Sequence, residues 1–296
     1  MKLLFITNVV NRLDFLEFQN ITLKKFCKNE YQFCVVDDSF DKKISIKFQK
    51  FCIQNKISYF KKPYIQINNP ADACANTIQW TYDNIIQKIY SDYLIFYIDS
   101  DMFLIDEFIL DEKLKNQFIG GVKQIREHVI YPWNGLMFLN MKKINELDPY
   151  INFKNDTIDG ILTDVGGSVY HYLKKHNISF FNFDTLYPEY FESINLHKFQ
   201  LTKGFNFELH YKKKFLHFRA GSNWQLKKYW KKVNYKNEKD KIFEKIMNKS
   251  INNLSVINLF SNFKVDNTNI DVEKKFIKIS QIKAKIKYFL NKIISF

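Results

Sequence analysis

Glycine is scarce in this chain, with only 8 among 296 residues. None occurs in Thr7–Arg12, directly after the first predicted strand. A loop that grips a triphosphate through backbone N–H groups needs glycine there, because side chains keep the backbone away from the phosphates. The sequence therefore lacks the triphosphate-binding loop that many nucleotide-binding enzymes carry at this position.

Cysteine is also sparse. The four cysteines lie far apart and form no Cys-x-x-Cys pair, so the sequence indicates neither a thiolate zinc site nor a disulfide framework. We expect reduced, mostly buried thiols, as in a cytoplasmic protein. These cysteines are Cys27, Cys34, Cys52 and Cys74.

No apolar run in the sequence approaches the length of a membrane span. The segment Met1–Asn8 is short and apolar, but no small-residue cleavage site accompanies it. We expect this segment to form the first strand of the fold. Together these features predict a cytoplasmic protein that is soluble or peripheral on the inner face of the membrane.

Positive charge is concentrated in the last part of the chain. The net charge is +14, and residues 225–296 hold 17 lysines, no arginine and 6 acidic residues. The preceding residues hold 28 basic and 25 acidic residues and are nearly neutral. A nucleic-acid enzyme needs a basic active face on its body, so this distribution argues against a nucleic-acid partner.

The first half of the chain alternates strand and helix patterns, and the second half is less regular. Strand patterns fall at residues 2–10, 31–36, 57–60, 93–98, 118–123, 135–140, 180–183 and 215–218. Helical patterns fall at residues 14–26, 44–55, 70–90 and 163–176. This alternation predicts an α/β fold with a mostly parallel central sheet and helices on both faces. We place this domain at residues 1–230 and a basic helical extension at 231–296.

Two carboxylates, Asp99 and Asp101, interrupt the apolar run at residues 92–105. If the strand continues through them, side-chain alternation places both on one face. Two anionic oxygens beyond the carboxyl end of a buried strand suit a divalent cation that carries a diphosphate. Such a triplet also arises by chance in an Asp-rich chain, so other segments of the sequence must show whether it is a metal site.

Two other acidic segments suit the same site. Asp37 and Asp38 follow the second strand, where a carboxylate either binds ribose hydroxyls and base N–H groups or caps a turn. Asp164 opens a predicted helix, where it serves as a general base for an acceptor hydroxyl or as an N-cap. The aromatic segment Tyr131–Gly135 is either a platform for a sugar ring or a strand-entry turn.

A late segment, residues 216–224, combines a histidine, an arginine and a glycine. His217 and Arg219 share a strand face, as a nitrogen ligand for a metal and a partner for phosphate. Gly221 permits a turn whose backbone N–H groups meet phosphate oxygens. The other histidines, including His210, show no ligand spacing and are expected to be structural.

The end of the chain has a helical pattern in which an isoleucine and phenylalanine stripe is surrounded by lysines. A basic amphipathic helix of this kind either lies on a membrane surface or packs on the domain with its lysines in solvent. The stripe consists of Ile279, Ile282, Ile286, Phe289 and Ile293.

In this order, the segments resemble the nucleotide-sugar-dependent glycosyltransferases of the GT-A fold. Residues 5–12 and 35–39 are similar to the start of the inverting family two, and helix 70–90 with Asp99-Ser100-Asp101 resembles its metal-binding region. Residues 134–140 and 217–222 are similar to the retaining family eight. The resemblance covers about residues 3–224 and does not reach the tail.

The resemblance implies a metal-dependent glycosyltransferase of the Leloir type, most similar to hexosyltransferases. Asp101 matches the direct ligand of Mn²⁺ or Mg²⁺, Asp99 supports the ribose or the metal, and His217 matches a late metal ligand. Asp37 matches the acid near the base of the nucleoside-diphosphate sugar. Asp164 falls where inverting members carry their base, but Thr163 precedes it where they have a Glu-Asp pair.

Two other classes compete with this interpretation. A nucleotidyltransferase acting on sugar phosphates would carry a glycine-rich loop after the first strand, which is absent here. A non-catalytic carbohydrate- or membrane-binding protein with the same fold would not need the acidic pair, which is intact. The expected partners are thus a nucleotide-sugar donor and a glycan or lipid-linked glycan acceptor, with membrane contact through the basic helix.

Overall fold

The computed structural model describes residues 2–190, 207–218, 243–248, 260–264, 282 and 285–286. Its centre is a seven-stranded sheet in the order β10-β6-β7-β4-β1-β2-β3, in which only β7 runs against the other strands. The strands are β1 (Leu3–Val9), β2 (Tyr31–Asp37), β3 (Ser58–Lys61), β4 (Leu94–Ile98), β6 (Ile119–Arg126), β7 (Val129–Asn140) and β10 (Phe181–Phe183). The predicted mixed α/β fold with a mostly parallel sheet is confirmed.

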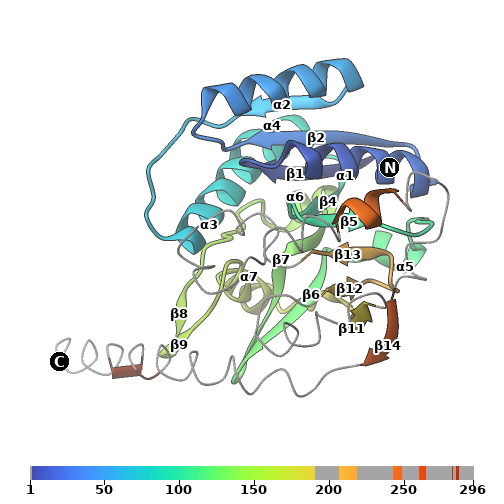
Figure 1. The fold of residues 1–296 in the computed structure, drawn as a ribbon. Coiled ribbons are helices and arrows are strands. Elements are labelled where there is room, and N and C mark those ends of the chain that lie inside the picture. The colour runs from blue at the N-terminus through green and yellow to red at the C-terminus, as the bar shows by residue number, and fades with distance from the viewer. Residues whose placement is uncertain are drawn as a thin grey trace.

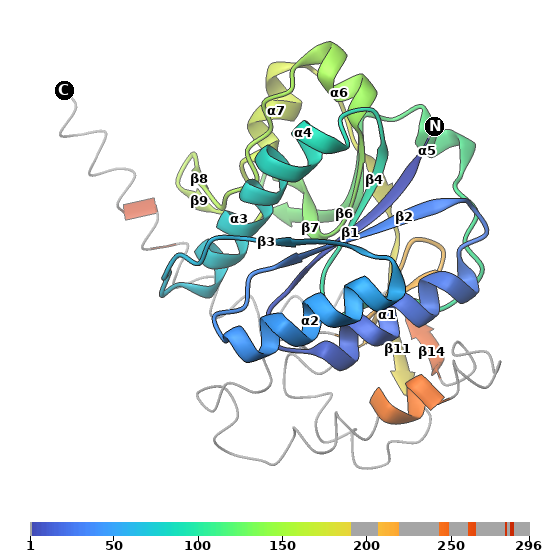
Figure 2. The same ribbon diagram turned by 90° about the horizontal axis from the view of Figure 1, so that it is seen from above.

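Helices cover both faces of this sheet, as Figure 2 shows. One face carries α1 (Leu13–Phe26) and α2 (Lys42–Asn55), and the other carries α3 (Pro70–Thr81), α4 (Gln87–Ile89), α6 (Met141–Leu147) and α7 (Val169–Lys175). Alternation along β1 explains both layers: Leu3 and Phe5 join the core under α1 and α2, whereas Leu4 and Ile6 join the core under α3 and α6.

The helix predicted at residues 70–90 begins as expected. The Asn69 side chain caps it by accepting a hydrogen bond from the Ala71 N–H at 3.0 Å, and Pro70 occupies the first turn. A π-helical segment, η1 (Tyr82–Ile86), joins α3 to α4, so the helical stretch ends at Ile89. Among the described residues, no helix combines the length and apolar character needed to cross a bilayer.

A second, antiparallel sheet lies beside the first (Figure 1) and has the order β14-β11-β12-β13-β5. Its strands are β5 (Met102–Leu104), β11 (Thr185–Tyr190), β12 (Glu208–His210), β13 (Phe215–His217) and β14 (Phe260–Lys264). A short α5 (Glu112–Lys115) and a small hairpin of β8 (Thr157–Ile158) and β9 (Ile161–Leu162) complete the named elements. The chain passes from the first sheet to the second between β4 and β5, and the predicted acidic pair lies at that passage.

Candidate functional site

Asp99 and Asp101 lie in a turn between β4 and β5. The strand predicted at residues 93–98 does not continue through them, since β4 ends at Ile98 and the Met102 N–H donates to the Asp99 carbonyl at 3.0 Å. The Asp99 N–H in turn donates to the Gly135 carbonyl of β7 at 2.8 Å. The chain bends here because it leaves one sheet for the other, and both acids remain at the carboxyl end of β4.

Gln19 of α1 holds this turn from the core side. Its side-chain amide donates to the carbonyls of Asp99, at 2.8 Å, and of Met102, at 3.0 Å, and Gln19 is 1% exposed. Nothing in the sequence pattern distinguishes this glutamine from other polar residues on helices. Its role is visible only once α1 is packed beneath the turn.

Pairing between β5 and β13 brings His217 to Asp101 across 116 residues of sequence. His217 pairs with Met102 in the antiparallel register, and the Phe218 N–H donates to the Asp101 carbonyl at 2.8 Å. As a result, His217 Nε2 lies 3.4 Å from Asp101 Oδ1, and both side chains are buried. The structure thus joins two residues that the sequence analysis named as ligands of one metal.

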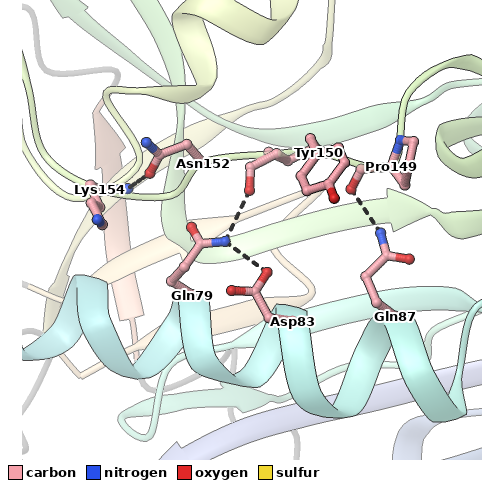
Figure 3. Close-up of a pocket in the computed structure, with 8 residues that line it drawn as sticks. Gln79, Asp83, Gln87, Pro149, Tyr150, Asn152 and Lys154 are labelled. Atoms are coloured by element: carbon pink, nitrogen blue, oxygen red, sulfur yellow. Dashed lines mark hydrogen bonds between the residues drawn. The ribbon is translucent and has the colours of Figure 1, made fainter.

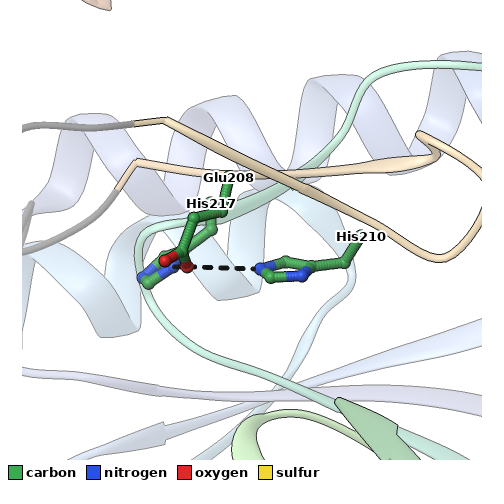
Figure 4. Close-up of side chains that lie close together, drawn as sticks. All are labelled: Glu208, His210 and His217. Carbon is green, nitrogen blue, oxygen red and sulfur yellow. Dashed lines mark hydrogen bonds and ion pairs between the residues drawn. The ribbon is translucent and has the colours of Figure 1, made fainter. Parts of the chain in front are cut away.

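Glu208 and His210 extend this group, as Figure 4 shows. His217 Nδ1 lies 2.6 Å from Glu208 Oε2, and His210 Nε2 lies 3.5 Å from the same oxygen. The Trp133 ring packs against both imidazoles, with centroid distances of 5.8 Å to His210 and 4.9 Å to His217. One ligand atom from each of Glu208, His210 and His217 lies within 4.8 Å of the others.

His210, expected to be structural, thus lies beside Glu208 and His217. Glu208 and His210 are two positions apart on β12, so their side chains share a face. That Glu-x-His spacing was the available signal, and it gains meaning only when β12 is recognised as a strand paired with β13.

The charges at this site favour a bound cation. Burial raises the pKa of Asp99 to about 7, and repulsion from Asp101 adds to the rise. Burial lowers the pKa of His217, but the carboxylates of Asp101 and Glu208 outweigh it and raise that pKa to about 10. Clustered buried carboxylates thus stabilise positive charge between them, either on a proton or on a metal ion.

Asp37 and Asp38 are both engaged by protein groups at the end of β2. Asp37 is fully buried and accepts hydrogen bonds from the Ser39 N–H and the Tyr59 hydroxyl, both at 2.7 Å. Burial alone would raise the pKa of Asp37, but these hydrogen bonds outweigh it and lower the pKa. Asp38 pairs with Lys62 at 2.9 Å, and its side chain stays 18% exposed. Asp38 is therefore the one of these two acids that is accessible to solvent, just beyond the carboxyl end of β2.

Asp164 is exposed and directly precedes a buried turn at residues 165–168, so it does not lie at a helix start. The helix begins at Val169, so the predicted start at 163 and the N-cap alternative for Asp164 are wrong. The cause is Gly166, whose φ of +93° breaks the helical path. A Cβ at Gly166 would lie 2.4 Å from Asn134 Oδ1, so the turn packs closely on β7. The Asp164 N–H donates to the Tyr131 hydroxyl at 2.8 Å.

The aromatic segment at residues 131–135 lies within β7 and not before it. Tyr131 is fully buried, and the Trp133 ring lies against Gly135, where a Cβ would be 2.1 Å from ring carbons. Gly135 is required because a side chain would displace this ring. Trp133 therefore packs on the two histidines of the site.

Cys74 of α3 is a thiol whose pKa responds to several of the predicted site acids. Its side chain has solvent contact, yet the surrounding protein raises the pKa of the thiol by desolvation. The negative charges of four carboxylates raise this pKa further, and they belong to Asp99, Asp164, Asp38 and Asp101. Cys74 is one of the four cysteines expected to be reduced, and all four are free.

A separate groove of about 610 Å³ lies on the outer side of α3 and α4 (Figure 3). Gln79 crosses it, because its amide donates to Asp83 at 3.0 Å and to the Ile151 carbonyl at 3.1 Å. None of the site carboxylates lines this groove. Its lining residues are Gln79, Asp83, Gln87, Pro149, Tyr150, Ile151, Asn152 and Lys154.

Several predicted features fall outside the described residues, namely Arg219, Gly221, the domain boundary at residue 230 and most of the terminal helix. Within that helix, Ile282 and Ile286 are described and are 50% and 54% exposed. Lys285 between them pairs with Glu127 at 2.8 Å.

Comparison with models of protein families gave no match, and comparison with curated proteins gave none. Among solved structures, the crystal structure of S. aureus TarS is similar, with a TM-score of 0.34 and 13% identity. The similarity covers 53% of this chain and 30% of that chain. At this TM-score the likeness carries no weight, and the site stands on its own geometry.

Proposed function

We propose that this protein is a metal-dependent glycosyltransferase that moves a sugar from a nucleoside-diphosphate sugar to a hydroxyl acceptor. The observation that supports this most is the approach of Asp101 and His217 to 3.4 Å beside Asp99, at the carboxyl end of β4. Ligands of open α/β sheets bind beyond the carboxyl ends of the strands. The resemblance to the GT-A glycosyltransferases names the same three residues.

The donor set fits a divalent cation. Two ligand atoms that each lie about 2.0–2.2 Å from one ion are about 3.0–3.4 Å apart. The separation of Asp101 Oδ1 from His217 Nε2 is 3.4 Å, which is the spacing expected of two atoms that bind one ion. Carboxylate oxygens suit Mg²⁺ and Mn²⁺, and one imidazole favours Mn²⁺.

The remaining residues then have distinct roles around the donor. A cation held by Asp101 and His217 would offset the negative charge that develops on the diphosphate leaving group. Asp99 would support the ion or the ribose. Asp38, which is accessible to solvent, would bind the nucleoside. The buried Asp37 would hold the end of β2 in place through its hydrogen bonds. In an inverting reaction Asp164 would accept the proton of the acceptor hydroxyl. A retaining reaction needs no base at that position.

The acceptor we propose is a hydroxyl of a glycan or of a lipid-linked glycan. The lysine-rich end of the chain supports the lipid-linked form, because anionic membrane surfaces attract such segments. The donor would come from the cytoplasm.

A thermal-shift scan tests the proposal directly. We expect nucleoside diphosphates to raise the unfolding temperature only when Mn²⁺ or Mg²⁺ is present, because the ion links the diphosphate to the carboxylates. Incubation with a panel of nucleotide sugars should then identify the donor by slow hydrolysis. No metal-dependent stabilisation by any diphosphate would contradict the proposal, and stabilisation without turnover would favour a non-catalytic binding protein.

Asp101→Asn removes one ligand charge while keeping the side-chain shape. We expect turnover of the identified donor to fall by about 100-fold or more, because the ion contributes several kcal/mol of charge stabilisation. Asp159→Asn is the matched control, since Asp159 is 64% exposed and lies away from the site. Circular dichroism establishes that both variants fold. Near-normal turnover in Asp101→Asn would refute the assignment of Asp101 as a ligand.

A further inference from the structure

Glu208 and Asp101 contact different nitrogens of the His217 ring. The two residues face each other across the β12–β13 pair, and Glu208 Oε2 is 2.6 Å from His217 Nδ1. The opposite ring nitrogen, Nε2, is the one that lies 3.4 Å from Asp101 Oδ1. The imidazole is therefore placed between two carboxylates, one at each nitrogen.

The chemistry of this contact fixes the tautomer of His217. An ionised carboxylate has no proton to donate, so at 2.6 Å it is His217 Nδ1 that must carry the hydrogen. Nε2 lies on the side of Asp101. A cation there would displace the Nε2 proton and bind the lone pair, because metal binding requires the neutral ligand form of histidine. Packing of the Trp133 ring, 4.9 Å from the imidazole, limits rotation of the ring away from this orientation.

An alternative metal site would consist of Glu208, His210 and His217, because one ligand atom from each residue lies within 4.8 Å of the other two. Two ligands of one ion are about 3.0–3.4 Å apart, but Glu208 Oε2 and His217 Nδ1 are 2.6 Å apart. That distance is a hydrogen bond and leaves no room for an ion between the atoms. The separation at Asp101 is the one that fits an ion.

We infer that Glu208 is a positioning residue, which orients His217 Nε2 toward the metal by accepting the Nδ1–H. This inference rests on the proposed function, because it assumes a cation at Asp101 and His217. A carboxylate behind a metal-binding histidine fixes the ring and raises its basicity. His210 lies behind Glu208, with Nε2 at 3.5 Å from Oε2, and makes no contact with the ion in this arrangement.

The test measures Mn²⁺ affinity of the full-length protein by electron paramagnetic resonance of the free ion. We expect Glu208→Ala to weaken binding by about 10- to 100-fold, the usual effect of losing such a partner. Glu208→Gln retains an acceptor oxygen and should recover part of this loss. Asp101→Asn should weaken binding strongly, and His210→Ala, which removes contacts to Glu208 and Trp133 but no ligand of the ion in this arrangement, should weaken it less than Asp101→Asn.

A second readout reports the tautomer itself. Long-range ¹H–¹⁵N spectra of the imidazoles, recorded with diamagnetic Mg²⁺, distinguish a proton on Nδ1 from one on Nε2, and His217→Gln assigns the signal. We expect the Nδ1–H form in the wild type and a shift toward the Nε2–H form in Glu208→Ala. Glu107→Gln, an exposed carboxylate outside the site, should change neither readout.

Three results would overturn the inference. Wild-type Mn²⁺ affinity with an unchanged tautomer in Glu208→Ala and Glu208→Gln would show that Glu208 does not position His217. A loss in His210→Ala as large as in Asp101→Asn would place the ion among Glu208, His210 and His217. Both of these leave the proposed glycosyl transfer intact, whereas an absence of Mn²⁺ and Mg²⁺ binding by the wild type would remove both proposals together.

Discussion

One buried amide, that of Gln19, fixes the turn that carries both site carboxylates. Its two donated hydrogen bonds satisfy the carbonyls of Asp99 and Met102. Gln19→Leu fills the same space but leaves both carbonyls without this donor, at a cost of about 1–3 kcal/mol for a buried group. We expect the free energy of unfolding, measured in urea, to fall by about 2 kcal/mol, and Mn²⁺ affinity to fall as the turn loosens.

The matched control is Gln54→Leu, at an exposed position on the neighbouring helix α2. Surface substitutions of this kind change stability by about 0.5 kcal/mol or less. If Gln19→Leu behaves like Gln54→Leu, the turn is held by other contacts.

At the scale of single residues, the sequence named candidate site residues where a motif exists and did not name those whose contacts only the fold defines. Asp99, Asp101 and His217 were named from an acidic triplet and a late histidine. Gln19 belongs to no recognisable motif, and the Glu-x-His spacing of Glu208 gains meaning only when β12 pairs with β13. Such residues become apparent only after folding brings distant segments together.

At the scale of elements, Asp148 links the end of α6 to the end of α7. Its carboxylate pairs with Lys175 at 2.6 Å and accepts the Tyr150 N–H at 2.9 Å. The hydrogen bond from Lys175 and that from Tyr150 lower the pKa of Asp148 from 3.8 to about 2. Because the folded pKa is depressed, the ionised carboxylate stabilises the fold above about pH 4, and this stabilisation disappears as the pH falls toward 2.

Asp148→Asn should therefore unfold at a lower urea concentration than the wild type at pH 7, and the difference should shrink steadily between pH 5 and pH 3. Glu146→Gln, an exposed position on the same helix, provides the comparison. A difference that stays constant over this pH range would show that the charge of Asp148 does not contribute.

The elements of the large sheet were predictable, whereas those of the second sheet mostly were not. Strands such as β1 and β4 are long apolar runs joined by helices with clear periodicity, so their pattern is local. In the second sheet, β5, β12 and β13 have three residues each and pair across more than 100 residues between β5 and β13. Three residues show no reliable period, and only the partner strand makes them a sheet.

At the scale of the whole molecule, late segments of the chain pack against elements of the first half and pair with the second sheet. The segment 243–248 is helical and contributes Phe243 and Ile246 to a core with Phe15 and Phe18 of α1. Strand β14 pairs with β11, so a further piece of the late chain joins the second sheet. Both pieces belong to the stretch that the sequence assigns to a separate extension beyond residue 230.

The division of the chain at residue 230 stays a prediction, and a substitution of Phe243 can test it. Phe243 is 2% exposed, with its ring centroid 4.6 Å from that of Phe15 and 5.5 Å from that of Phe103. If residues 231–296 fold with the body, Phe243→Ala should lower the unfolding free energy of the whole protein by about 3–5 kcal/mol, as for other buried phenylalanines. Glu244→Ala, at the exposed neighbouring position, should leave it nearly unchanged. An unfolding transition of the body that does not respond to Phe243→Ala would show that the extension is independent, because a core shared by both parts cannot lose a ring without weakening the sheet to which α1 belongs.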